Sequence, residues 1–68
     1  MNPQIPRSMR ELESRRNDGI HVRLLWGEHD GRLVVAVDDA KTGDRFGIEV
    51  RRHERALDVF HHPFAYAA

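Results

Sequence analysis

Five histidines are the side chains of this chain best suited to bind a metal ion or to transfer a proton near neutral pH. His61 and His62 are adjacent, so on a helix they point about 100° apart and do not chelate one ion together. His29 lies between Glu28 and Asp30, and carboxylates accompany imidazole at zinc sites. However, the chain has no cysteine and no two histidines four residues apart. We therefore expect no metal site and no cofactor, and we expect His61 and His62 to lie in the last turn of a helix, where imidazolium is favoured.

The acidic residues and the serines are the other side chains that could bind calcium or act in catalysis. The acidic segment at residues 38–44 is shorter than a twelve-residue calcium loop and lacks its terminal glutamate, so we interpret it as the tip of a hairpin. Ser8 and Ser14 are the only serines, and both lie in the expected N-terminal arm, outside any formed pocket. A core this small also leaves little room for a concave site. The sequence therefore predicts no catalytic residues and no enzymatic activity.

Three stretches with alternating apolar and polar residues form the expected centre of the protein. They cover residues 20–26, 32–39 and 45–51, and their period of two with β-branched and aromatic side chains indicates strands with one buried face. Asp30 and Gly31 give a hairpin signal between the first two strands, and Gly43 suits a position with positive φ between the last two. Short turns make neighbouring strands antiparallel, so the strand order is expected to follow the chain.

The segment before this meander is expected to form a charged N-terminal arm. Residues 1–6 contain two prolines and are interpreted as a flexible terminus, followed by one small domain over residues 7–68. Ser8 and Glu11 fit a capping box, which predicts a weak helix over residues 7–16 with Met9 and Leu12 on one face. The arginines of this arm either lie on a solvated helix or contact phosphate, and the interleaved acids favour the solvated helix.

The C-terminal segment allows two interpretations. Good helix formers and the neighbouring apolar residues Val59 and Phe60 favour a short helix over residues 54–61, stopped by Pro63. The alternative is a strand in which Leu57, Val59 and His61 alternate with Asp58 and Phe60. We expect the helix, with Phe64 and Tyr66 packing as an aromatic tail. The predicted fold class is therefore α+β, in the order α-β-β-β-α.

Size and charge limit the function classes. Sixty-eight residues without cysteine bury little surface, so a second chain is one way to gain stability, and we expect a homodimer or a complex with another protein. The 11 basic and 11 acidic residues give no net charge, which removes the global basic field typical of a nucleic-acid binder. No apolar run reaches the length of a membrane span and no signal peptide is visible, so we expect a cytoplasmic protein without a membrane contact.

Apolar residues on both faces of the meander indicate an interface. Leu25, Val34 and Ala36 lie on the face opposite the one expected to be buried, and an uncovered apolar patch commonly marks a binding surface. Trp26 is a core residue in one interpretation and an interface anchor in the other. The candidate interface residues are thus Leu25, Val34, Ala36, Trp26, Phe64 and Tyr66.

These features predict a small protein-interaction module that self-associates and has no catalytic activity. The alternative function is nucleic-acid binding, to DNA or RNA, by an arginine-bearing sheet face. Its candidate contacts are Arg23, Arg45, Arg51, Arg52 and Arg55.

Two segments carry a resemblance to other proteins. The stretch from Ala56 to Ala67 reads ALDVFHHPFAYA, and Arg15 to Ile20 reads RRNDGI. With these segments the chain resembles a set of short uncharacterised proteins of actinobacteria, over most of its length after Leu12. The resemblance implies a bacterial cytoplasmic setting and no particular activity.

Overall fold

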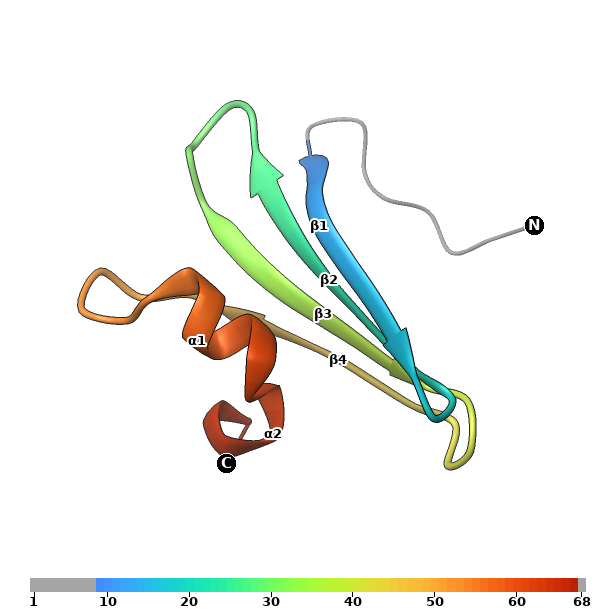
Figure 1. Ribbon diagram of the computed structural model, residues 1–68. Coiled ribbons are helices and arrows are strands. Elements are labelled where there is room, and N and C mark those ends of the chain that lie inside the picture. Colours follow the sequence, from blue (N-terminus) through green and yellow to red (C-terminus); the bar gives the residue numbers. More distant parts are fainter. Residues whose placement is uncertain (1–8, 68) are drawn as a thin grey trace.

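The computed structural model describes residues 9–67, which form a four-stranded antiparallel sheet and two short helices (Figure 1). The strands are β1 (Met9–Asn17), β2 (Ile20–Gly27), β3 (Leu33–Asp39) and β4 (Asp44–Glu49), and they lie side by side in chain order. The helices are α1 (Ala56–His61) and α2 (Pro63–Tyr66). The predicted α+β class and antiparallel meander are therefore confirmed, but the order is β-β-β-β-α-α. The expected flexible terminus at residues 1–6 lies outside the described residues.

The prediction of a helix over residues 7–16 is wrong, because β1 occupies most of that segment. β1 pairs with β2 through a tight turn in which Asp18 and Gly19 both have positive φ, at 55° and 81°. Two such residues are typical of the type I′ hairpin turn, whose twist matches that of the strands. A bulge between Glu11 and Glu13 interrupts the pairing and hides the alternation of β1. Ser8, the other member of the expected capping box, is outside the described residues.

The three predicted strands are confirmed as β2, β3 and β4, with ends that differ by one or two residues. Gly31 and Gly43 have φ of 68° and 78°, as the turn signals predicted. The amide of Gly43 donates a hydrogen bond to the carbonyl of Asp39 at 2.8 Å, which closes the turn between β3 and β4. These turns fix the register of all three strands, because a slip of one residue would move every side chain to the other face.

Both helices lie on the same side of the sheet (Figure 1). Val59 and Phe60 of α1 are buried against the alternate residues of β2 and β3, and this contact forms the core. The buried cluster consists of Val22, Leu24, Val35, Val37, Val59 and Phe60. The helix over residues 54–61 is thus confirmed in type, starting two residues later, and the strand alternative for this segment is wrong. Pro63 ends α1 and begins α2, where a missing amide hydrogen costs nothing.

Arg15 of β1 joins the sheet to the end of α1. It pairs with Val22 in the sheet, so its side chain points to the helix side. One Nη of its guanidinium donates to the carbonyl oxygens of Phe60 at 2.9 Å and His61 at 3.3 Å. The guanidinium also lies 5.4 Å from the centre of the Phe60 ring. Arg15 therefore satisfies carbonyls that the end of a helix leaves without a partner.

Candidate interaction face of the sheet

The side of the sheet away from α1 and α2, named here the open face, is built from aligned cross-strand rows of side chains. The backbone register places one residue from each strand in each row. The His21 row consists of Arg16, His21, Asp38 and Arg45. The Arg23 row consists of Ser14, Arg23, Ala36 and Gly47. The Leu25 row consists of Glu11, Leu25, Val34 and Glu49.

The centre of the open face is apolar. Leu25 has only 6% of its surface exposed yet is not part of the core cluster, and Val34 and Ala36 beside it are half-buried. Gly47 at the end of the Arg23 row is exposed. Within residues 9–67, both helices pack on the opposite side and none covers this patch. Three of the predicted interface residues, Leu25, Val34 and Ala36, are therefore brought together on one surface.

Two ion pairs flank the apolar centre. Arg45 Nε lies 3.3 Å from a carboxylate oxygen of Asp38, its cross-strand neighbour in the His21 row. At the other end, Arg32 donates two hydrogen bonds to Glu49, at 2.7 and 3.0 Å. The paired guanidinium and carboxylate planes make Arg32 and Glu49 a bidentate pair with fixed geometry. These four residues have their charges compensated within the chain.

Three other charged residues of the open face have no such compensation. Among the described residues, Arg16, Arg23 and Glu11 form no ion pair within 4.0 Å. The Nε of Arg23 is buried and has no hydrogen-bond acceptor in that part of the chain. A buried donor without an acceptor costs about 1–3 kcal/mol, so Arg23 is held on the open face without full compensation within the described residues.

The basic end of the open face also changes the protonation of His21. Partial burial and the positive charges of Arg16 and Arg23 lower the pKa of His21 from 6.5, and Glu11 and Asp38 oppose this less strongly. These side chains, with Ser14, surround a shallow depression open to solvent.

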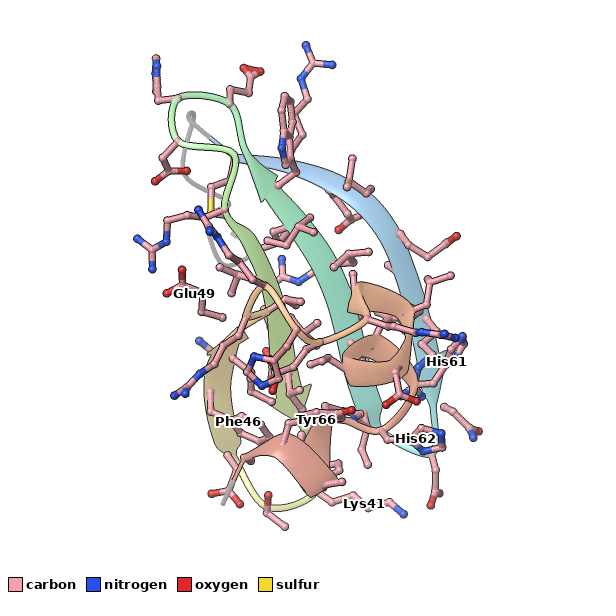
Figure 2. The ribbon with its side chains drawn as sticks, turned by 90° about the vertical axis from the view of Figure 1, so that its left-hand side faces the viewer. Lys41, Phe46, Glu49, His61, His62 and Tyr66 are labelled. Carbon is pink, nitrogen blue, oxygen red and sulfur yellow. The ribbon has the colours of Figure 1, made fainter. Side chains whose placement is uncertain are left out.

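The other predicted interface residues lie on the helix side. Trp26 is half-buried there, outside the core cluster, because it alternates with Leu25 along β2. Phe64 is 53% exposed, and its ring meets the ring of Phe46 edge to face at 5.6 Å. Tyr66 packs at the border of the core and donates a hydrogen bond to a carboxylate oxygen of Asp58. Figure 2 shows Phe46 and Tyr66 close together beside α2.

The arginines predicted for nucleic-acid binding are divided between surfaces. Arg23 and Arg45 belong to the open face, in adjacent rows. Arg51 and Arg52 lie in the connection after β4, and Arg55 precedes the first residue of α1. Arg16, which the sequence analysis assigned to the arm, joins Arg23 on the open face instead.

The histidines lie at several separate places in the fold. Within residues 9–67, no group of three histidine, aspartate or glutamate side chains has the arrangement of a metal site. His29 lies in the turn between β2 and β3, whereas His61 and His62 lie at the end of α1, beside β1 (Figure 2). None of the helices formed by the described residues has the length and apolar character needed to cross a bilayer.

Comparisons with models of protein families, with curated proteins and with solved structures found no match for this chain.

Sequence reasoning missed Arg16, Ser14 and Glu11 as members of the open face, because it placed them on a helix. The signal that could have shown this is the Asp18-Gly19 dipeptide. An Asp-Gly pair between two segments of mixed polar and apolar residues strongly indicates a hairpin. Had that hairpin been recognised, its register would have placed Arg16 beside His21 and Ser14 beside Arg23.

Proposed function

We propose that this protein is a self-associating interaction module without catalytic activity, and that its open face binds a second copy of the chain. The observation that carries the proposal is the apolar patch of half-buried Val34 and Ala36 beside the buried Leu25, which no helix within residues 9–67 covers. A sheet of this kind gains stability when its second face is also covered, and two sheets pack readily face to face. The lack of cysteine suits a reducing compartment, so a bacterial cytoplasmic setting stays part of the proposal.

The size of the open face sets the expected affinity. Four strands about 4.8 Å apart, each about 20 Å long, present a surface on the order of 400 Å² before side-chain relief is counted. A standard interface buries about 800 Å² per partner. We therefore expect a weak dimer that dissociates on dilution.

Light scattering after size-exclusion chromatography tests the proposal across a range of protein concentrations. The expected result is a mass that rises from one chain toward two as the concentration rises. A mass of one chain at every concentration, up to about 1 mM, would contradict it. A monomer that binds duplex DNA or RNA at low salt would instead favour the alternative function, through Arg16, Arg23 and Arg45.

A substitution at Gly47 separates association from folding. A Cβ at Gly47 would meet the nearest atom, a Val34 methyl, at 3.5 Å, which is ordinary van der Waals contact. A side chain there is therefore tolerated by the strand, and glycine is the weaker strand former. Gly47→Glu should keep the fold and abolish the dimer by placing a charged side chain on the open face. Leu57→Glu is the matched control, because Leu57 is 59% exposed on α1 and lies on the helix side.

A further inference from the structure

We infer that the two copies pair through the Glu11 carboxylate of one and the Arg23 guanidinium of the other, with their strands antiparallel across the interface. This inference rests on the proposed function, since it specifies the geometry of that same dimer. It begins from the residues of the open face whose charges are uncompensated among residues 9–67, which include one acid, Glu11, and two bases, Arg16 and Arg23.

The symmetry of a two-chain assembly decides which rows can meet. In a two-fold dimer, if one residue contacts another across the interface, the reverse contact also forms. For two sheets packed face to face with their strands aligned, the axis lies between them, either along the strands or across them. An axis along the strands would place the His21 row over its own copy, with the strand order reversed. Arg16 of one chain would then lie opposite Arg45 of the other. That arrangement is disfavoured by like charges.

An axis across the strands reverses the row order and gives opposite charges. If the axis passes between the Arg23 row and the Leu25 row, each of these rows lies over the other row of the second copy. Val34 then faces Ala36, and Leu25 faces the aliphatic stem of Arg23. The small side chain of Ala36 and the lack of a side chain at Gly47 allow close approach of the two sheets at this position.

The same arrangement brings Glu11 to the basic end of the second copy. Glu11 begins the Leu25 row, so it faces Ser14 and lies diagonal to Arg23 of the other chain. Its carboxylate is an acceptor for the terminal guanidinium nitrogens of Arg23, which forms no ion pair among the described residues. Burial between the sheets strengthens such a charge-assisted contact. Two-fold symmetry forms it twice, so each substitution acts twice in one dimer.

Charge reversal at the two positions tests the pairing. In Glu11→Arg, both contacts become arginine against arginine, and in Arg23→Glu both become glutamate against glutamate. Each variant alone should associate at least about tenfold more weakly than the original chain. In a mixture, the heterodimer has one restored original pair and one reversed pair of opposite charge. Its Kd should therefore return to within about threefold of the original value.

Native mass spectrometry measures this directly when one variant carries a nitrogen-15 label, because the heterodimer then differs in mass from both homodimers. Glu13→Arg is the matched control: it makes the same charge change on the same strand, but Glu13 pairs with Leu24 and lies on the helix side. Control and original chain should form the same fraction of dimer. Circular dichroism of each variant confirms that the sheet is retained.

The outcomes separate the two proposals. If the original chain dimerises but both reversed variants dimerise equally well, the Glu11–Arg23 pairing is refuted and self-association stands. If the original chain is monomeric throughout, both fail. A chain lacking residues 2–8 that dimerises where the full chain does not would assign the open face to the N-terminal segment of the same chain, which also overturns the inference. Weaker dimerisation of each variant alone, together with recovered dimerisation in the mixture of the two, supports the inference.

Discussion

Arg15 provides the sharpest test of how the helices are held to the sheet. Its guanidinium donates to the carbonyl oxygens of Phe60 at 2.9 Å and His61 at 3.3 Å, and it lies 5.4 Å from the centre of the Phe60 ring. Arg15→Met keeps an aliphatic stem of similar length and removes only the guanidinium. We expect this substitution to lower the free energy of unfolding by about 2 kcal/mol.

The magnitude follows from three contributions. A hydrogen bond from a charged donor contributes about 1.5–3 kcal/mol, and a cation–π contact adds about 0.5–1 kcal/mol. The attraction between the charge and the end of α1 involves the same carbonyls, so it is not added again. In the opposite direction, the Nε of Arg15 is buried without an acceptor among the described residues, and its removal relieves about 1 kcal/mol. The balance is a loss of about 2 kcal/mol.

Urea denaturation at one fixed protein concentration measures the change. For a small domain with a slope of about 1 kcal/mol/M, the midpoint should fall by about 2 M. Arg52→Met is the matched control, because Arg52 is exposed in the connection after β4. Arg15→Lys should give an intermediate loss, since lysine keeps the charge without the planar fork. A loss of less than about 0.5 kcal/mol for Arg15→Met, equal to that of the control, would refute the reasoning.

Three further outcomes are expected from single sites. Because the folded state lowers the pKa of His21, the unfolded chain binds a proton first as pH falls. The free energy of unfolding should therefore decrease as the pH falls through about 6.5, and His21→Gln should remove this part of the dependence in denaturation series at several pH values. Gly19→Ala should lower the free energy of unfolding by about 1–2 kcal/mol because of the positive φ at that turn. Gly47→Ala should leave this free energy unchanged or raise it. Equal thermal midpoints for the two variants would contradict this expectation. The hydrogen bond to Asp58 raises the pKa of Tyr66, so Asp58→Asn should move the ultraviolet titration of this single tyrosine to lower pH, and an unchanged curve would show that the bond does not persist in solution.

Much of the sheet could be predicted from the sequence because its signals are local. The alternation in β2, β3 and β4 indicates which side of each strand is buried, and Gly31 and Gly43 occur where the turns need positive φ. These features predicted antiparallel neighbours and the chain order of three strands. They also placed Leu25, Val34 and Ala36 on one surface, since side chains two residues apart share a face.

β1 could not be assigned in this way. It is an edge strand, and its charged side chains suit an edge that must not pair with other chains. With the bulge between Glu11 and Glu13, the segment shows neither a clear period of two nor a clear helical stripe. The weak helical signal of Glu11 was overridden by backbone hydrogen bonding to β2, which only the assembled sheet provides.

The sequence by itself therefore determined the strands β2, β3 and β4, their turns, the C-terminal helix and the apolar centre of the open face. The tertiary structure alone decided which charged residues act together. Arg15 meets the carbonyl of Phe60 across 45 residues of chain, and Arg16 joins Arg23 only because β1 pairs with β2. The physical reason is that patterns along the chain report which face a side chain takes, whereas charge pairing depends on neighbours brought together by strand register and helix docking.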